Sequence, residues 1–268
     1  MLRAVFIPHP QAPLLPARFL VRYDRFIAVV RLDSGEEVEA HCVNPGRMEG
    51  LVRPGARAWV SAVPPDSPRK LRYTLELLDI DGVAIGVNTQ LPNLLAETLL
   101  RQRRLSGLKR YRALEREVPY GERSRIDLRL TTASGLHFIE VKNCHLVYPD
   151  GGAYFPDSVS TRAAGHLEEL ARCAAAGHRA TVLFTVQRPD AAFVRPSDLH
   201  DPAFAAAARR ARAAGVRFRA ACFAPTPEGF EYLGERPVRL GAYALEPLRG
   251  WRDALLPASG WRRRARKA

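Results

Sequence analysis

An aspartate, a glutamate and a lysine stand at mid-length of two short, mainly apolar segments near the middle of the chain. The stretch SRIDLRLTTASGLHFIEVKNC, residues 124–144, carries Asp127 in its first half and Glu140 and Lys142 in its second. Two carboxylates about 4 Å apart repel each other by roughly 4 kcal/mol at an effective dielectric constant near 20. A lysine offsets part of that repulsion, and a divalent cation offsets more, since Mg²⁺ and Mn²⁺ favour oxygen ligands. The residue types therefore suit a Mg²⁺ or Mn²⁺ site, or else a structural ion pair at Glu140 with Asp127 left in solvent.

The apolar pattern around these residues predicts two adjacent strands. Apolar and polar residues alternate over 126–130, as in a half-buried strand, and a second strand over 138–142 follows a turn at Ala133-Ser134-Gly135. Residues two apart on a strand share a face, so Glu140 and Lys142 point the same way. If the turn joins a hairpin, Asp127 lies on the neighbouring strand and the three side chains converge.

Glu117, upstream of the hairpin, is a candidate third acid for the same site. It stands in the triplet Arg116-Glu117-Val118, so an exposed ion pair with a nearby arginine explains it equally well. The residue type alone does not separate these two interpretations.

The chain is strongly basic along its whole length. Its 268 residues carry a formal net charge of +13, of which residues 251–268 contribute +5, so the remainder is basic too. Such a charge favours a polyanionic partner, nucleic acid first, although a generally basic proteome is the alternative. Residues 101–125 hold nine Lys or Arg against three Glu, with two tyrosines between them, a composition that suits either nucleic acid or a solvated face. Candidate phosphate contacts are Lys109, Arg110 and Arg125, with Arg22, Arg25, Arg47 and Arg57 nearer the N-terminus.

Cysteine spacing and hydropathy indicate the cellular compartment. The four cysteines form no CxxC pair and no metal-ligand spacing, which fits a reducing cytoplasm. No apolar run approaches the roughly 20 residues that span a membrane. Prolines at positions 8, 10 and 13 interrupt the apolar start, which argues against a signal peptide. The sequence predicts a cytoplasmic protein with no membrane segment.

The hydropathy pattern and the turn-forming residues divide the chain into four parts. Residues 1–17 are expected to form an irregular, proline-rich lead-in. Short strands separated by turn signals fill 18–88, which predicts a small β-barrel of OB type or a fragment of a β-sandwich. Strands alternating with helices over 89–245 predict an α/β domain with a mixed sheet. Residues 246–268 are expected to form a mobile basic tail. Expected strands include 26–32, 37–42, 57–63, 73–80, 83–87, 181–186 and 216–223; expected helices cover 91–104, 158–176 and 201–215, with a Gly/Pro/Tyr loop over 148–156.

Four stretches, in order, resemble one known family. They are HCVNPGRMEG (41–50), VPYGERSRIDL (118–128), FIEVKN (138–143) and YFPDSVSTRAAGHLEEL (154–170). Together they are similar to the sugar fermentation stimulation protein A family, with the resemblance running from about residue 15 to about 240. It implies an N-terminal OB-like domain followed by a PD-(D/E)xK domain, the restriction-endonuclease-like fold, and DNA binding in a family usually described as regulatory.

The resemblance also assigns roles to the hairpin residues. Asp127 matches the acid of the nuclease motif, Glu140 and Lys142 match its ExK part, and Glu117 matches an upstream acid. The implied catalytic set is these four residues. The implied Mg²⁺ or Mn²⁺ ligands are Asp127, Glu140 and the carbonyl of Val141, with Lys142 positioning a water.

The helix after the hairpin carries two more residues of this set. Arg162 and His166 are four positions apart, so they share one helical face with Glu169. That face presents them either to the scissile phosphate or metal, or to ordinary solvent.

Three functions remain open at this level. The first is metal-dependent hydrolysis of phosphodiester bonds in double- or single-stranded DNA. The second is a DNA-binding regulator that keeps the nuclease-like fold without hydrolysis, because a fold does not guarantee a chemistry. The third is an RNA-binding or RNA-processing factor, since OB domains accept single strands readily. The oligomeric state stays open, with a homodimer as one option.

Overall fold

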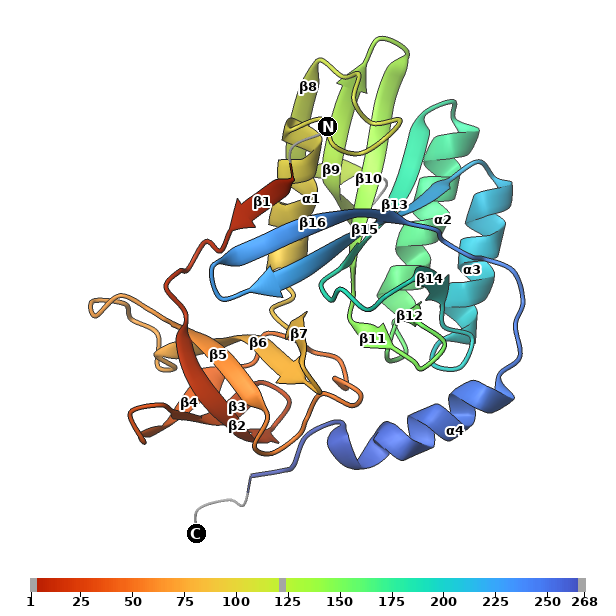
Figure 1. Ribbon diagram of the computed structural model, residues 1–268. Helices are drawn as coiled ribbons and strands as arrows, with labels where there is room; N and C mark the ends of the chain where they lie inside the picture. The colour runs from red at the N-terminus through yellow and green to blue at the C-terminus, as the bar shows by residue number, and fades with distance from the viewer. Residues whose placement is uncertain (1–3, 121–123, 265–268) are drawn as a thin grey trace.

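The computed structural model describes residues 4–120 and 124–264 of the chain. Two β-rich parts make up the molecule: a barrel at the N-terminal end and a larger mixed sheet with helices on both faces (Figure 1). Among the described residues, no helix is long and apolar enough to cross a membrane. The mixed α/β architecture with an N-terminal barrel, predicted from the sequence, is confirmed.

Five strands close the barrel, and their alternating apolar side chains fill it. The strands are β2 (Leu15–Tyr23), β3 (Ile27–Leu32), β4 (Glu37–His41), β5 (Arg57–Ala62) and β6 (Tyr73–Ile80). They pair in the order β4-β3-β2-β5-β6, and a parallel pairing of β4 with β6 closes the ring. Strand β7 (Val83–Gly86) extends β6 through the hairpin turn at Asp81-Gly82, where both residues have positive φ. Phe19, Val30 and Leu75 are fully buried inside the barrel.

The mixed sheet has seven strands. In spatial order they are β1 (Val5–Pro8), β16 (Gly229–Arg236), β15 (Arg217–Thr226), β13 (Arg179–Val186), β10 (Gly135–Cys144), β9 (Ser124–Thr132) and β8 (Ala113–Tyr120). Strands β10, β13 and β15 are parallel, and the flanking pairs are antiparallel. A small sheet of β11 (Leu146–Val147), β12 (Gly152–Phe155) and β14 (Phe193–Pro196) lies beside it, so the expected loop over 148–156 contains a strand.

Helices cover both faces of this sheet. Helix α1 (Leu91–Arg101) packs its leucines on one face, and helices α2 (Thr161–Ala175) and α3 (Pro202–Ala213) pack on the other. Ser160 caps α2 by accepting from the backbone N–H of Ala163, and Asp201 caps α3 in the same way. Such caps satisfy backbone donors that a helix start leaves free. The three expected helices are thus confirmed, with boundaries shifted by up to three residues.

The N-terminal segment differs from expectation. Residues 1–17 are predicted to be irregular, but strand β1 forms within them and pairs antiparallel with β16. Val5 and Ile7 are buried by this pairing. The apolar run Val5–Ile7 before the first proline is too short a pattern to predict a strand, and its partner strand β16 lies more than 200 residues away in the sequence.

The C-terminal segment is also ordered where a mobile tail is expected. Helix α4 (Glu246–Leu255) and a short 3₁₀ turn (Leu256–Ala258) follow the mixed sheet. Leu248 packs against an aromatic cluster that includes Tyr148 and Tyr154. The chain then returns to the barrel, where Arg262 bridges to Tyr23 (Figure 1). Packing of Leu248 against the aromatic residues orders this segment, although its basic composition predicted a mobile, solvated tail.

Arg22, one of the candidate phosphate contacts, is a structural residue instead. Its side chain is fully buried. The guanidinium donates to the carbonyl of Asn44 at 2.6 Å, of Gly46 at 3.0 Å and of Arg25 at 2.8 Å. A longer contact of 3.4 Å reaches the carbonyl of Gly260. Arg22 therefore ties three segments of the chain together and is not available to a ligand.

Arg22→Leu is expected to lower the free energy of unfolding by about 2–4 kcal/mol, because it strands buried carbonyl groups without donors. Urea denaturation followed by circular dichroism measures the loss. Arg31→Leu is the matched control, since Arg31 makes an exposed ion pair with Glu37 at 2.7 Å, and such pairs contribute about 0–1 kcal/mol. Equal losses in the two variants would contradict the structural role of Arg22.

Candidate active site

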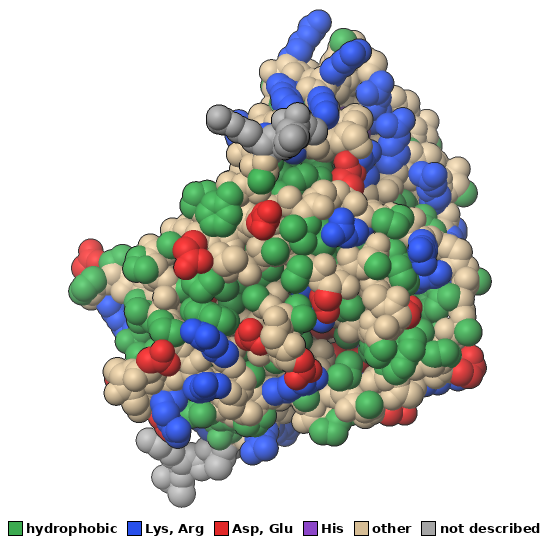
Figure 2. All heavy atoms as spheres, in the orientation of Figure 1, with side chains coloured by type: hydrophobic (Ala, Val, Ile, Leu, Met, Phe, Trp, Pro, Cys, Tyr) green, Lys and Arg blue, Asp and Glu red, His purple; other side chains and the backbone are tan. Residues whose placement is uncertain are grey.

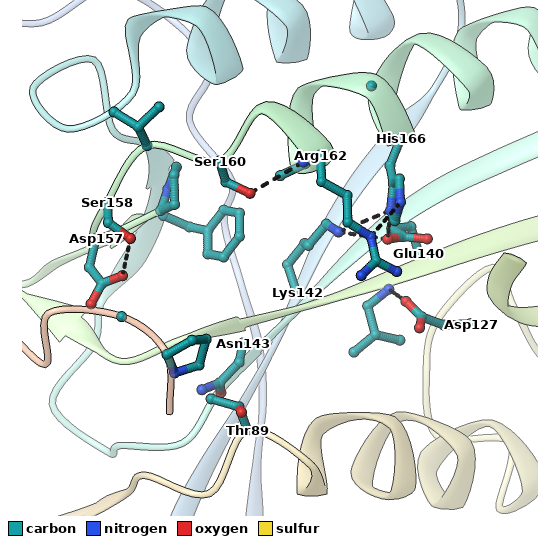
Figure 3. A pocket seen from close by; sticks show the side chains of 18 of the residues that line it. Thr89, Asp127, Glu140, Lys142, Asn143, Asp157, Ser158, Ser160, Arg162 and His166 are labelled. Atoms are coloured by element: carbon teal, nitrogen blue, oxygen red, sulfur yellow. Dashed lines mark hydrogen bonds and ion pairs between the residues drawn. The ribbon is translucent and has the colours of Figure 1, made fainter. Parts of the chain in front are cut away.

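A cleft of about 1240 Å³ lies between the barrel and the mixed sheet. The barrel contributes Arg25 and the loop 44–47, the mixed sheet contributes parts of β8, β9 and β10, and α2 contributes its first turns together with the loop before it. Figure 3 shows Asp127, Glu140, Lys142 and His166 near one another at one end, with Asp157 toward the other. The hairpin residues picked out from the sequence therefore meet in one large concave site.

Asp127 occupies the point where β9 and β10 separate. The strands pair up to Leu128 and Ile139. One residue further, the Asp127 carboxylate accepts the backbone N–H of Val141 at 2.7 Å, and the side-chain amide of Asn93 on α1 donates to it at 3.0 Å. The Asp127 side chain thus takes the place of a main-chain acceptor for the N–H of Val141, where the hydrogen bonds between β9 and β10 end. The expected hairpin and its convergence of side chains are both present.

Two side chains hold one oxygen of Glu140. Lys142 Nζ donates to Glu140 Oε1 at 2.6 Å, and His166 Nδ1 contacts the same oxygen. Arg162 Nε donates to His166 Nε2 at 3.3 Å. An arginine N–H only donates, so His166 Nε2 accepts and its Nδ1 carries the proton given to Glu140. The face of α2 that carries Arg162 and His166 is thus turned toward the site, not only toward solvent.

The pKa values of the two carboxyl groups shift in opposite directions. Desolvation, and then the charge of Glu140, raise the pKa of Asp127 from 3.8 to about 6. Burial would also raise the pKa of Glu140, but the hydrogen bond from His166, together with the positive charge and hydrogen bond of Lys142, outweighs burial and leaves that pKa below its ordinary value. Glu140 is therefore the carboxyl group that ionises more readily, and the repulsion between the two groups makes ionisation of Asp127 less favourable.

Three buried oxygens near Glu140 have no hydrogen-bond partner among the described residues. They are Glu140 Oε2, Glu169 Oε2 and the hydroxyl of Tyr120. Burial raises the pKa of Tyr120, and the charges of Glu140 and Glu169 raise it further, so the three groups lie close enough to interact. A buried carboxylate oxygen without a donor is costly, and a cation or ordered water relieves that cost. Tyr120 and Asn93 are site residues that sequence patterns did not single out.

The donor set for a cation is small. Within the residues that the structure describes, no three His, Cys, Asp or Glu side chains are grouped as metal ligands. Asp127 and Glu140 remain two like-charged carboxylates in one cleft, which Val141 also lines. Two carboxylates and a carbonyl are the oxygen donors that Mg²⁺ and Mn²⁺ accept, so the residues fit such an ion.

Glu117 also lines the cleft, from strand β8. The pairs Arg116 with Leu128 and Val118 with Ile126 place it opposite Asp127. Its φ of +50° lies in the left-handed region, which is unusual for a glutamate in a strand. The side chain is exposed and its oxygen is 3.5 Å from the amide of Asn93. Glu117 is therefore near Asp127 without sharing its burial.

The candidate phosphate contacts divide into two groups. Arg125, Arg162, Arg25 and Arg47 line the cleft and are exposed. Lys109, Arg110 and Arg57 lie outside it. Arg57 instead stacks its guanidinium over the Trp59 ring, 5.0 Å from the centroid. Part of the stretch VPYGERSRIDL, residues 121–123, lies outside the described residues.

Positive charge also gathers away from the cleft. On the face drawn in Figure 2, Lys and Arg side chains are concentrated toward the top of the molecule, over strand ends of the mixed sheet. On strand β10, burial of His137 and then the charges of Arg179, Arg217 and Arg219 lower its pKa to about 4. The basic character predicted from composition is therefore spread over more than one surface.

A partly buried aspartate joins the two walls of the cleft. Asp157, in the loop before α2, accepts the backbone N–H of Met48 at 3.2 Å. Its carboxylate lies against Gly46, where an added Cβ would stand 2.5 Å from both carboxylate oxygens. Only glycine leaves room for this contact. The stretches HCVNPGRMEG and YFPDSVSTRAAGHLEEL therefore meet here, on opposite sides of one cleft.

Comparison with known proteins accounts for both halves of this arrangement. Residues 20–87 match a family model described as the SfsA N-terminal OB domain. Residues 90–229, more than half of the chain, match the sugar fermentation stimulation protein RE domain. The chain belongs to the sugar fermentation stimulation protein family. Its barrel is the OB domain of that family, and its mixed sheet with helices is the restriction-endonuclease-like domain.

Relatives in this family align over most of the chain. A sugar fermentation stimulation protein homolog of Geotalea uraniireducens is 45% identical over 230 residues, covering 85% of this chain and 98% of the relative. A homolog of Dinoroseobacter shibae is 46% identical over 211 residues, or 77% and 85% of the two chains. A solved structure of Pyrococcus furiosus SfsA, described as a complex with Ca²⁺, is 29% identical with a TM-score of 0.78. It covers 87% of this chain and 98% of that one.

Asp127→Asn is expected to stabilise the metal-free protein above pH 6 and to have little effect near pH 4. The folded-state pKa of about 6 exceeds the ordinary 3.8, so stability from protonated Asp127 is fully present below 3.8 and is lost as pH rises through 6. The asparagine does not ionise, and the gain at pH 8 is about 3 kcal/mol. Urea denaturation in EDTA from pH 4 to 8 measures it.

Asp33→Asn serves as the control for this pH series, because Asp33 is exposed on a barrel hairpin. Its stability difference from the parent stays flat across the range. Parallel curves for the Asp127 variant and the parent would show that the carboxyl is not perturbed as described.

Proposed function

We propose that the cleft is a divalent-metal-dependent phosphodiesterase site that acts on DNA. One observation carries this proposal: Asp127, Glu140 and Lys142 converge in a cleft whose rim holds exposed arginines. Paired carboxylates with an adjacent amine suit metal-assisted hydrolysis, and guanidinium groups suit phosphate. Membership of a family with a restriction-endonuclease-like domain supports the same chemistry.

Asp127, Glu140 and the carbonyl of Val141 would hold the cation. Glu140 Oε2, which has no partner within the part of the chain that the structure describes, supports this assignment, since the other oxygen already accepts from Lys142 and His166. The related Pyrococcus furiosus protein, solved in complex with Ca²⁺, supports binding of a divalent cation. When bound, Mg²⁺ or Mn²⁺ lowers the pKa of a water and stabilises charge on the phosphate.

The remaining residues position the reacting groups. Lys142 orients the attacking water through its ammonium group, which Glu140 holds at 2.6 Å. His166 fixes Glu140 and is itself fixed by Arg162. Arg162 and Arg125 are exposed on the cleft and would bind the phosphate next to the scissile bond. Glu117 would complete the acidic side of the site opposite Asp127.

A DNA-binding regulator without hydrolysis is the second candidate. The contact that favours it is the ion pair between Lys142 and Glu140, which occupies the amine that would otherwise act on a water. Both functions require salt-sensitive binding to DNA, and only the first requires cleavage. RNA as the preferred ligand, the third function open from the sequence, is tested by competition between RNA and DNA of equal length.

Asp127→Ala is expected to reduce Mg²⁺- or Mn²⁺-dependent cleavage of labelled DNA by at least about 100-fold, because one of two carboxylate ligands is lost. DNA binding remains within about threefold of the parent, since phosphate contacts carry most of the affinity. Gel-resolved cleavage with and without metal, and fluorescence anisotropy, give the two readouts. Asp33→Ala is the matched control and cleaves at the parent rate.

Cleavage by the Asp127 variant at the parent rate would overturn the catalytic assignment. Binding by the parent with no cleavage of single- or double-stranded DNA in either metal would favour the regulator instead.

Arg162→Gln is expected to make DNA binding less sensitive to salt. About six phosphate contacts give the parent a slope of about −5 for log K against log[salt], and the loss of one contact reduces that magnitude by about 1. Anisotropy titrations between about 50 and 200 mM salt measure both slopes. Arg57→Gln, outside the cleft, keeps the parent slope, and a parent affinity that barely changed with salt would count against phosphate binding.

A further inference from the structure

Trp261 lines the cleft on its barrel side, outside both segments that match the family models. The ring is 39% exposed. Val159, in the loop before α2, is 74% exposed and lines the cleft from the opposite domain. Of the large apolar side chains that stand exposed in the described chain, these two alone border the cleft. Neither the fold nor the chemistry assigned above uses them.

The backbone holds the Trp261 segment firmly in place. The N–H of Arg262 donates to the carbonyl of Arg22 at 2.9 Å, and the carbonyl of Arg262 accepts from the N–H of Asp24 at 3.0 Å. On the other side of Trp261, the N–H of Gly260 donates to the carbonyl of Arg47 at 2.6 Å. Backbone hydrogen bonds to the barrel on both sides of Trp261 thus fix the position of its ring.

Cations surround the same ring. The Arg25 guanidinium lies 4.9 Å from the ring centroid, and that of buried Arg22 lies 5.6 Å away. Arg25 and Arg47 are exposed and line the cleft beside it. An exposed aromatic ring next to guanidinium groups is the combination that binds single-stranded nucleic acid: the cations follow the phosphates and the ring stacks on a base.

Base pairing decides which form of DNA can stack a base on the Trp261 ring. In a duplex, both faces of each internal base are covered by its neighbours, so an aromatic side chain has no base face to contact. An unpaired base has a free face, and stacking on it is insensitive to sequence. The positioned ring therefore discriminates by strand structure.

We propose that Trp261 stacks on an unpaired nucleobase and that the cleft takes a single-stranded segment of DNA, with Val159 packing from the α2 side. This proposal rests on the proposed function, since it names the substrate class of the same cleft. Phosphates of the bound strand contact Arg25 and Arg47 on the way to Asp127 and Glu140. The C-terminal segment thereby contributes to substrate choice.

The test compares single-stranded DNA with a blunt duplex of the same sequence. Trp261→Ala is expected to weaken binding of the labelled single strand about tenfold in fluorescence anisotropy, and to change duplex binding less than about twofold. Trp261→Phe keeps an aromatic ring and retains most of the affinity. Phe6→Ala is the matched control, since Phe6 is 47% exposed and lies outside the cleft on β1. It leaves both affinities unchanged.

A second measurement follows the fluorescence of the Trp261 ring. Adding unlabelled single-stranded DNA quenches tryptophan emission of the parent, and Trp261→Phe binds while losing most of that quench, although Trp59 and Trp251 remain. Unchanged single-strand affinity in Trp261→Ala, or an undiminished quench in Trp261→Phe, overturns this inference and leaves the hydrolytic site standing. If Trp261→Ala selectively loses single-strand affinity while the parent protein never cleaves DNA, the inference is supported and only the proposed hydrolysis is overturned.

Discussion

Asp127 and Glu140 lie close together in a poorly solvated part of the cleft, and the repulsion between them is the constraint to which their neighbours respond. Lys142 and His166 donate to one oxygen of Glu140, and Arg162 fixes the histidine. Asn93 and the backbone of Val141 donate to Asp127. Even so, the pKa of Asp127 stays raised, because burial and the charge of Glu140 exceed what these donors supply. The protein keeps two like charges together, and one oxygen of Glu140 has no hydrogen-bond partner among residues 4–120 and 124–264, an arrangement that structural stability alone does not favour.

The two domains are coupled through their contact at the cleft. Gly46 receives Asp157 where any side chain would collide, and Arg22 fastens the loop around Gly46 to the barrel from behind. Asp157 also accepts the backbone N–H of Met48, and buried Arg22 donates to the Gly46 carbonyl, so the barrel loop and the loop before α2 keep a fixed separation. The width of the cleft is therefore set by packing between domains as well as by the hairpin that carries the acids.

The parts that the sequence predicts well are those whose signal is local. The first strand of the hairpin over residues 124–144 alternates with period two before the turn at Ala133-Ser134-Gly135, and Asp201-Pro202 marks the start of α3. Strand β8 was hidden inside a basic stretch, because most of its side chains are exposed and show no apolar face. Arg22 and Arg25 look alike in sequence, and only three-dimensional packing buries the first and exposes the second. Tyr120 and Asn93 reach the site through strand pairing and helix placement that no short motif encodes.

The path of the chain between the domains limits how the protein can be divided. Strand β1 belongs to the mixed sheet although it precedes the barrel, and the residues after α4 leave the mixed sheet to rejoin the barrel. A fragment beginning at α1 would leave the outer edge of β16 uncovered, with unpaired N–H and C=O groups that invite another copy to bind in register. A barrel fragment ending at β7 would lack the strand segment at Arg262 and the carbonyl that Gly260 offers to Arg22. The two domains are separable as families of sequence, yet in this chain each is completed by residues from the far end of the other.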